Sequence, residues 1–391
     1  MMADETVGVL PTGWTLTSMG EIGRYLNGFA FSSQTWARSG RPIIRIQNLT
    51  GSGSEFNYFE GDIEDRYIVR NGDLLFSWAA TLGVFVWRGP EAVLNQHIFK
   101  VESRVNNSFH RYLIEHKIAE MMQQTHGTGM VHITKKKFDS VSVFEPPMVE
   151  QEKIVEILEE QLSRLDAALA SVRAVQEKSV RFRRSLLHAA FAGALTGHDT
   201  TTVELPFGWE EVQLGELADV GWGDLQVTKS SFIDSGFIAY SAAGPDGFRE
   251  GFDFDQDGIV LSAIGAGCGR TWYAKGRWSC IKNTIRILEK SKRIKLEFLY
   301  QQLSDPNAWP KRGSGQPFIS QKDARELLVK VPPLSEQTVI VQILEEQLSR
   351  LDASLTIADA IEKKASALRR SLLHAAFSGN LTKEWREGAH V

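Results

Sequence analysis

The sequence is poor in several features that would point to specialised classes of protein. Its two cysteines, Cys268 and Cys280, cannot form a framework of disulfides, which predicts a reduced, cytoplasmic chain. No stretch approaches the roughly 20 consecutive apolar residues that cross a bilayer. Residues 1–10 lack the basic and apolar pattern of a signal peptide. Lys and Arg number 44 against 48 Asp and Glu, so the totals do not indicate a strongly basic nucleic-acid-binding protein.

Motifs for catalysis and metal binding are also missing. There is no Asn/Asp-Pro-Pro-aromatic tetrad of the kind amino-methyltransferases use, and no Walker A lysine motif. The run from Gly265 to Gly269 follows an apolar segment, but a strand is expected after it where a nucleotide-binding loop needs a helix. No Cys/His spacing is typical of zinc, and we expect packing roles for His188 and His374. The sequence therefore predicts a non-enzymatic chain without a metal site.

The most informative feature present is an internal duplication. Residues 157–167 and 343–353 both read ILEEQLSRLDA, and residues 183–191 and 369–377 both read RRSLLHAAF. Members of each pair are 186 residues apart, so the register holds without a gap through both segments. A weaker echo upstream relates the two Leu-Pro-x-Gly-Trp sequences that end at Trp14 and Trp209. The chain therefore alternates two divergent segments with two nearly identical ones.

The duplicated segments are predicted to be long amphipathic helices. Each begins after a Pro-Pro pair and ends before Gly193 or Gly379, and the first helix should run from Glu150 to Ala192. Apolar residues recur in steps of three and four, as in a coiled coil. The expected seams are Ile154, Leu158, Leu162, Leu165, Leu169, Val172, Val175, Phe182 and Leu186, and Ile340, Leu344, Leu348, Leu351, Leu355, Ala358, Ile361, Leu368 and Leu372. A homodimeric coiled coil is one way to bury them, but we favour antiparallel pairing within one chain.

The divergent segments read as strand-rich domains. Short apolar or alternating runs bounded by Gly and Asn predict strands at 43–47, 73–78, 84–87 and 97–101, and at 258–261, 271–273 and 283–288. A helix is expected after each sheet, at 109–124 and 296–303. The predicted fold is α+β, with two mixed α/β domains separated by two long antiparallel helices in a pseudo-two-fold repeat. The expected boundaries are 1–145 and 197–331 for the domains, and 146–196 and 332–391 for the helical regions.

Neither domain is basic overall. Residues 1–145 carry 14 Lys and Arg against 15 Asp and Glu, and residues 197–331 carry 16 against 18, which weakens a simple phosphate-steering account of nucleic-acid binding. Basic runs nevertheless adjoin two glycine loops that could approach a phosphate. Arg, Gln and Asn side chains could read base edges, although each is more often an ordinary surface residue. The candidates for DNA binding are Arg45, Gln47, Asn48, Gln96, His97, Thr128, Lys135, Lys136, Lys137, Arg270, Asn283, Lys311, Arg312, Ser314, Gln316, Gln321 and Lys322.

These features together resemble the DNA-specificity subunits of type I restriction–modification systems over almost the whole chain. The resemblance rests on the two Leu-Pro-x-Gly-Trp sequences, on residues 44–48, 72–77 and 95–97, and above all on the duplicated helices. It implies that residues 1–145 and 197–331 are target-recognition domains. Each would read one half of a split, asymmetric sequence in double-stranded DNA.

The resemblance also implies partners and cofactors. Two methyltransferase subunits would dock on the helices, with Leu187, Phe191, Leu373 and Phe377 as candidate contacts, and translocase–nuclease subunits would complete a restriction enzyme. S-adenosylmethionine, ATP and Mg²⁺ would be bound by those partners, and none by this chain. The alternative reading is a homodimeric coiled-coil scaffold or adaptor whose globular domains bind protein.

Overall fold

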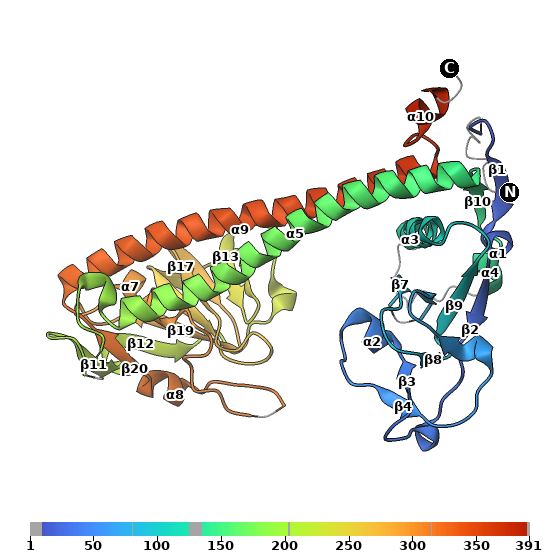
Figure 1. Ribbon diagram of the computed structural model, residues 1–391. Helices are drawn as coiled ribbons and strands as arrows, with labels where there is room; N and C mark the ends of the chain where they lie inside the picture. Colours follow the sequence, from blue (N-terminus) through green and yellow to red (C-terminus); the bar gives the residue numbers. More distant parts are fainter. Residues whose placement is uncertain (1–9, 80, 125–134, 202–203, 314, 389–391) are drawn as a thin grey trace. The chain divides into compact units, whose positions relative to one another are not determined.

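The computed structural model describes residues 10–79, 81–124, 135–201, 204–313 and 315–388. The chain forms two compact units (Figure 1). Unit 1 is Met1–Val172 with Ala360–Val391, and unit 2 is Arg173–Asp359. Each unit contains one strand-rich segment and a part of each of two long helices, α5 (Met148–Phe191) and α9 (Leu334–Phe377). No helix in these residues is both long and apolar enough to cross a membrane.

Unit 1 contains two four-stranded sheets and one strand pair. The sheets have the orders β2-β9-β6-β7 and β4-β3-β8-β5, and β1 pairs with β10. The strands are β1 (Thr15–Ser18), β2 (Gly23–Asn27), β3 (Arg41–Ile44), β4 (Asn57–Phe59), β5 (Ile68–Val69), β6 (Leu74–Ser77), β7 (Gly83–Val86), β8 (Ala92–Leu94), β9 (Ile98–Ser103) and β10 (Ser142–Glu145). The helices beside them are α1 (Met19–Ile22), α2 (Ile46–Thr50), α3 (Asn107–Gln124), α4 (Lys135–Asp139) and α10 (Lys383–Gly388).

Unit 2 repeats this topology strand for strand. Its sheets have the orders β12-β19-β16-β17 and β14-β13-β18-β15, and β11 pairs with β20. The strands are β11 (Glu210–Gln213), β12 (Ala218–Trp222), β13 (Phe237–Ser241), β14 (Gly244–Arg249), β15 (Phe254–Asp255), β16 (Gly258–Ser262), β17 (Thr271–Ala274), β18 (Arg277–Cys280), β19 (Thr284–Glu289) and β20 (Leu328–Val331). The shorter helices are α6 (Leu214–Leu217), α7 (Leu296–Leu303) and α8 (Gln321–Glu326).

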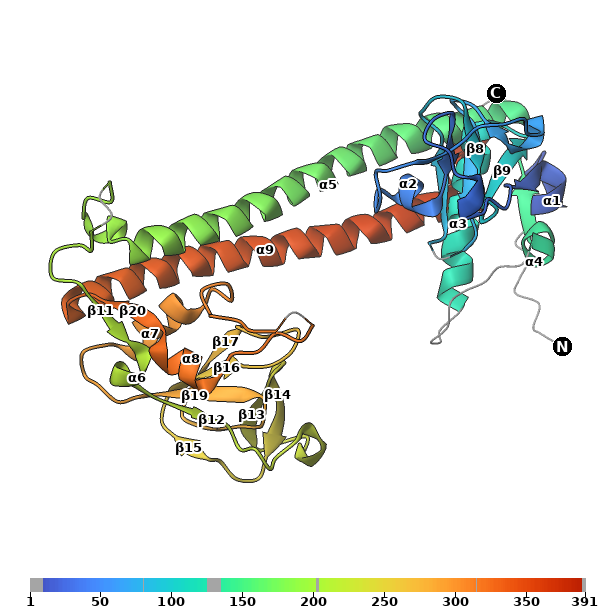
Figure 2. The same ribbon diagram turned by 90° about the horizontal axis from the view of Figure 1, so that it is seen from below.

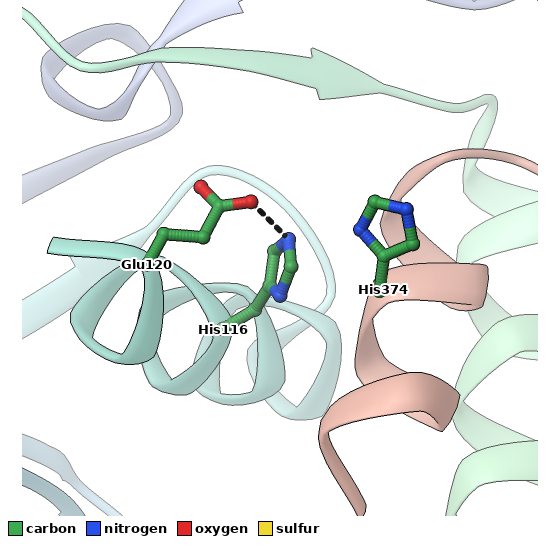
Figure 3. Close-up of side chains that lie close together, drawn as sticks. All are labelled: His116, Glu120 and His374. Atoms are coloured by element: carbon green, nitrogen blue, oxygen red, sulfur yellow. Dashed lines mark ion pairs between the residues drawn. The ribbon is translucent and has the colours of Figure 1, made fainter. Parts of the chain in front are cut away.

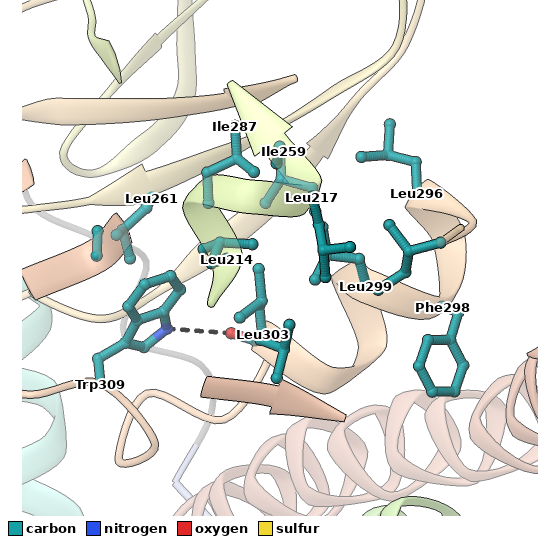
Figure 4. Close-up of a cluster of buried hydrophobic side chains, with 14 of the residues drawn as sticks. Leu214, Leu217, Ile259, Leu261, Ile287, Leu296, Phe298, Leu299, Leu303 and Trp309 are labelled. Carbon is teal, nitrogen blue, oxygen red and sulfur yellow. Dashed lines mark hydrogen bonds between the residues drawn. The ribbon is translucent and has the colours of Figure 1, made fainter. Parts of the chain in front are cut away.

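The core of each unit joins its sheets to the long helices. In unit 2 the buried cluster contains Leu261 of β16, Phe298 of α7 and Leu344 of α9. Figure 4 shows part of it, with the indole nitrogen of Trp309 donating a hydrogen bond to the carbonyl oxygen of Leu303 at 3.2 Å. In unit 1 the corresponding cluster includes residues of β6, α3, α5 and α9. The helices are therefore part of each globular core, and burial of their apolar faces stabilises both units.

The two long helices run side by side in opposite directions (Figures 1 and 2). In unit 2 the side chain of Gln176 donates to Asp359 at 3.0 Å, and Arg183 forms an ion pair with Asp352. A step of seven residues along α5 thus matches a step of seven backwards along α9. In unit 1 Arg369 pairs with Asp166 at 3.3 Å, which is the symmetry-equivalent contact. Intramolecular antiparallel pairing is confirmed, and it buries the seam that a homodimer would have needed.

The seam follows a different path from the predicted one in the middle of the helices. Val175 and Phe182 are exposed, and so are Ile361 and Leu368 in the second copy. The buried positions are Ser179 and Ala365, which continue an alternation of three- and four-residue steps from Val172 to Leu186 and from Ala358 to Leu372. Small residues and the two arginine–aspartate pairs thus replace large apolar side chains at the centre of the pair.

The predicted strands and short helices agree with the structure at most positions. The exception is residues 46–47, which were expected to continue the strand at 43–45 but begin helix α2. The physical reason is a local hydrogen bond, because the side-chain oxygen of Asn48 accepts from the backbone N–H of Arg45 at 2.9 Å and caps the helix. The stops predicted at Gly193 and Gly379 are confirmed, since both adopt left-handed backbone conformations with φ of 85° and 80°.

Candidate functional site

Several predicted residues of unit 1 converge where two parallel strands end. Strands β3 and β8 pair in parallel with Ile44 opposite Leu94, and the backbone N–H of Asn95 donates to the carbonyl of Ile44 at 3.1 Å. Arg45 and Gln96 therefore follow neighbouring strand ends, and the exposed side chains of Gln96 and His97 continue the same edge. We call Arg45, Gln47, Gln96 and His97 the unit 1 edge set.

Arg45 and Asn48, at the start of helix α2, differ in the hydrogen bonds that their side chains make. The guanidinium of Arg45 donates to the side-chain oxygen of Asn57 at 3.2 Å and lies 5.6 Å from the ring centroid of Trp36. The Asn48 amide is occupied by the backbone, because it accepts from Arg45 and donates to the carbonyl of Glu55 at 2.9 Å. Asn48 thus orders the loop, whereas Gln47 is exposed and Arg45 is only partly buried.

An aromatic hollow lies beside the unit 1 edge set. A cavity of about 480 Å³ is lined by Phe29, Tyr67 and Trp78 together with Gln96 and His97. Phe29 and Tyr67 meet edge to face at 5.4 Å, and the rings of Trp78 and His97 are 5.9 Å apart. In duplex DNA, apolar rings can contact thymine methyl groups while amide and imidazole groups read base edges. Sequence reasoning missed these aromatics; their only signal was Trp78 at the end of a predicted strand.

Unit 2 has the same edge with different side chains. Strands β13 and β18 pair in parallel with Tyr240 opposite Cys280, and the backbone N–H of Ile281 donates to Tyr240 at 3.0 Å. Asn283 follows with φ of 71°, and its carbonyl accepts from Ala263 at 2.9 Å. The exposed side chains of Arg270 and Asn283 thus flank the end of β16. The glycine run at 265–269 joins strand β16 to strand β17, so it lacks the helix of a nucleotide-binding loop.

A short loop completes the unit 2 edge. Arg312 and Phe318 exchange two backbone hydrogen bonds of 2.9 Å, and Gln316 is exposed between them. Lys311 packs against Gly269, where an added Cβ would lie 2.9 Å from the lysine Cε. Arg312, however, is held by Asp323, and hydrogen bonds from Ser320 and Arg312 lower the pKa of that carboxyl. We call Arg270, Asn283, Lys311 and Gln316 the unit 2 edge set.

Other predicted residues do not join these edges. Lys135, Lys136 and Lys137 lie on α4, which contacts α1 before the start of β2, whereas Phe29 follows the end of β2. A five-residue strand of about 16 Å therefore separates the lysines from the edge set. Lys135 also pairs with Asp139 at 2.5 Å.

In unit 2, Gln321 donates to the carbonyl of Val220 at 2.9 Å, and Lys322 lies 3.8 Å from Glu326. Both residues belong to α8, which packs on α6 and β12, so their observed contacts are structural. Thr128 and Ser314 lie outside the described residues.

The candidate partner contacts pack against the cores of the two units. Leu373 and Phe377 are buried in the unit 1 core, where Phe377 meets Phe109 at 5.4 Å. Leu187 and Phe191 pack against the unit 2 core, with Phe191 5.6 Å from Phe298. These repeated residues attach the ends of the long helices to the sheets. The large apolar groups that the helices do expose are Met148, Val149, Val175, Val180, Phe182, Leu334, Val339, Ile357, Ile361 and Leu368.

The duplicated Glu-Gln pair builds a joint in each unit. Glu150 accepts hydrogen bonds from the indole of Trp14 at 2.9 Å and the hydroxyl of Thr382 at 2.6 Å, and it pairs with Arg386. The next residue, Gln151, accepts from the backbone of Asn106 at 2.9 Å. One turn of helix thus ties together the Leu-Pro-x-Gly-Trp sequence, the entry to α3 and the segment after α9.

Glu336 occupies the equivalent place in unit 2. Trp209 donates to it at 2.9 Å, and Thr196 and His198 each at 3.1 Å. Burial would raise the pKa of Glu336, but the hydrogen bonds from Trp209, His198 and Thr196 outweigh it and leave the pKa below its usual value. The repeated Leu-Pro-x-Gly-Trp sequences are recognisable in the sequence, but no local pattern connects them with Glu150 and Glu336 in one joint.

Comparison with known proteins places the chain in a family. A family model described as the type I restriction modification DNA specificity domain matches twice, at residues 11–170 and 206–363. The chain belongs to this family. It is 25% identical to the type I restriction enzyme EcoBI specificity subunit of Escherichia coli, over 95% of this chain and 87% of that protein. It is 28% identical to the EcoDI specificity subunit of Escherichia coli over 47% of this chain and 41% of that protein.

The fold is also found among solved structures. A chain from a structure described as the structural basis of complex assembly and conformational transition of the type I R-M system superposes with a TM-score of 0.65. The two chains are 16% identical, and the match covers 95% of this chain and 99% of the other. The likeness concerns the fold, which is kept although most side chains differ.

Proposed function

We propose that this chain is the DNA-specificity subunit of a type I restriction–modification complex, in which each unit reads one half of a split target. The observation that carries the proposal is that the two units share one topology but present different side chains at the equivalent edge of the fold. Both units present polar side chains near the end of a pair of parallel strands. Unit 1 offers Arg45, Gln96 and His97 after β3 and β8, whereas unit 2 offers Asn283 after β18 and Arg270 beside the end of the neighbouring strand β16. Two similar folds that carry different base-contacting side chains are suited to the two different halves of an asymmetric sequence in double-stranded DNA.

The helices support two further parts of the proposal. Their near-identical sequences offer equivalent surfaces to two copies of one partner, which we propose to be methyltransferase subunits, with translocase–nuclease subunits as additional partners. Each recognition segment is close to neutral, so partner subunits would supply much of the contact with phosphates. We propose that the chain itself is non-catalytic and that S-adenosylmethionine, ATP and Mg²⁺ are bound by the partners.

The direct test is to exchange one recognition segment. Residues 11–145 are replaced by the equivalent segment of a relative, the methyltransferase subunits are co-expressed, and the methylated sites are mapped across a genome. We expect one half of the recognised sequence to change and the other to stay the same. A change in both halves would contradict independent readers, and failure to co-purify a methyltransferase subunit would contradict the assignment itself.

A finer test separates the edge set from the lysine run. In the assembled complex, Gln96→Ala should reduce discrimination at one base pair roughly tenfold, as expected for loss of about 1–3 kcal/mol of base contact. Lys136→Ala is the matched control in the same unit, because it removes an exposed lysine far from the edge. Equal losses of discrimination in both variants would place the reading surface elsewhere. The isolated chain, given tritiated S-adenosylmethionine and DNA, should transfer no methyl group.

A further inference from the structure

Three potential metal ligands meet between α3 and the end of α9 in unit 1. His116 and Glu120 are one turn apart on α3, and His374 lies on the last turns of α9 (Figure 3). One ligand atom from each residue lies within 4.8 Å of the other two. The imidazole Nε2 of His116 is 2.9 Å from a carboxylate oxygen of Glu120. The three side chains come from segments more than 250 residues apart in sequence, so the fold brings them together.

The surroundings hold two of these side chains in place. The His116 ring stacks on Phe377 with centroids 5.2 Å apart and planes inclined by 22°. The second carboxylate oxygen of Glu120 accepts from Lys117 at 2.8 Å, which leaves the first oxygen facing His116 and His374. Contacts of this kind orient metal ligands and reduce the conformational entropy lost on binding. His374 is exposed and can turn toward the other two.

The ligand chemistry fits a borderline divalent ion. Zn²⁺ takes imidazole nitrogen and carboxylate oxygen at about 2.0–2.2 Å in tetrahedral sites, which places neighbouring ligand atoms roughly 3.3 Å apart. The His116–Glu120 distance of 2.9 Å is slightly below that value, and the 4.8 Å limit for the three atoms lies above it, so binding would require His374 to move closer to the other two. Ca²⁺ and Mg²⁺ prefer all-oxygen ligands and fit poorly.

We propose that His116, Glu120 and His374 bind one Zn²⁺ ion or a similar transition-metal ion, which fastens the end of α9 to α3. Three protein ligands leave a fourth position for water. The ion would bridge the long helix and the recognition segment, because His374 belongs to α9 and His116 and Glu120 belong to α3. This site is independent of the proposed DNA reading.

Unit 2 provides an internal control. His188 is the repeat-equivalent of His374, but α7 has 8 residues where α3 has 18. Phe109 and Phe298 occupy matching places against Phe377 and Phe191, so α7 ends before the positions that would correspond to His116 and Glu120. No second group of three such ligands forms in the part of the chain that the structure describes.

The experiment is zinc titration of the full chain after removal of metals with EDTA. Isothermal calorimetry with ZnCl₂ should detect one ion per wild-type chain, and ZnCl₂ should raise the melting temperature. His374→Ala removes an exposed ligand and should weaken binding at least tenfold and abolish the thermal shift. His188→Ala should behave as wild type, and Glu120→Gln should weaken binding. Far-UV circular dichroism checks that each variant is folded.

Cobalt gives a second readout that does not depend on stability. Co²⁺ bound by imidazole and carboxylate ligands in a four-coordinate site absorbs strongly in the visible region, and this absorption should be lost in His374→Ala alone of the two histidine variants. The proposal is overturned if the wild type binds no Zn²⁺ with saturation, if His374→Ala binds as tightly as wild type, or if His188→Ala loses binding to the same extent.

Discussion

Glu150 and Glu336 occupy equivalent positions, yet their environments differ. The Glu150 side chain is 3% exposed and the Glu336 side chain 24% exposed. Removing Glu150 leaves the guanidinium of Arg386, the indole of Trp14 and the hydroxyl of Thr382 without their shared acceptor. We therefore expect Glu150→Ala to lower the free energy of unfolding by about 3 kcal/mol or more. Glu336→Ala should cost only about 1–2 kcal/mol, because water can replace the lost acceptor.

Urea unfolding followed by circular dichroism measures both effects. Glu152→Ala is the matched control, since Glu152 lies on the same helical turn as Glu150 but is exposed, and it should change stability by less than about 0.5 kcal/mol. Equal losses for Glu150→Ala and Glu152→Ala would show that the buried joint contributes little.

A buried histidine, His110, should make the folding stability of unit 1 depend on pH. Burial lowers the pKa of His110 to about 4, and the Tyr25 hydroxyl lies 2.7 Å from its Nε2. The unfolded chain takes up a proton near pH 6.5, whereas the folded chain does not until about pH 4. Neutral His110 therefore contributes to the free energy of unfolding. This contribution is fully present above pH 6.5 and is lost as the pH falls toward 4, by on the order of 3 kcal/mol.

Comparison of urea midpoints at pH 7 and pH 5 tests this expectation. His110→Gln cannot take up the proton, so its midpoint should fall less between the two pH values than that of the wild type, even if the variant is less stable at pH 7. A wild type and variant with the same pH slope would exclude His110 as the source.

At the scale of elements, two apolar residues that were both predicted to lie in the seam of the long helices, Phe182 and Leu186, differ in burial. Leu186 is 8% exposed and belongs to the unit 2 core, whereas Phe182, four residues earlier, is 47% exposed. We expect Leu186→Ala to cost about 2–4 kcal/mol, as cavity-forming substitutions do. Phe182→Ala should change stability by less than about 0.5 kcal/mol. Thermal unfolding of the two variants measures the contrast, and a large loss for Phe182→Ala would restore the originally predicted seam.

The same element shows what sequence periodicity can and cannot predict. The long helices and their ends at Gly193 and Gly379 follow from the duplicated apolar periodicity. The duplication favoured antiparallel pairing within one chain but left a homodimer open, because either arrangement buries the apolar faces. The centre of the seam does not follow from the periodicity, because Ser179 and Ala365 have little hydrophobic signal of their own. Their burial depends on the facing helix, whose register only the folded chain sets.

The candidate site was predicted unevenly for a related reason. Arg45, Gln96 and Asn283 adjoin strand ends that are recognisable in the sequence, so their gathering at sheet edges could be anticipated. The lysine run at 135–137 was grouped with them by its charge and by the glycine loop near it in the sequence, but the structure places it at the other end of β2. Glu120 and His374, or Glu150 and Thr382, are more than 200 residues apart, and no local pattern connects them.

At the scale of the whole molecule, α5 and α9 pass without interruption from the residues of one unit into those of the other. If these helices set the gap between two half-sites, their length should be measurable as base pairs. Four residues inserted after Val172 in α5 and four after Glu362 in α9 occupy facing positions in the observed register, so the pairs Asp166–Arg369 and Arg183–Asp352 are kept. Four-residue insertions are tolerated in coiled coils as local changes of winding.

The added length is about 6 Å of helix, which corresponds to one or two base pairs at about 3.4 Å each. Methylation mapping with the doubly extended chain should therefore return the same two half-sites with a gap longer by one or two base pairs. Extending α5 alone is the matched control, because it shifts one helix against the other by a full turn, breaks the ion pairs of one unit and should reduce stability without defining a new gap. An unchanged gap in the doubly extended chain would mean that the spacing is set outside these helices, by the partner subunits or by the DNA itself.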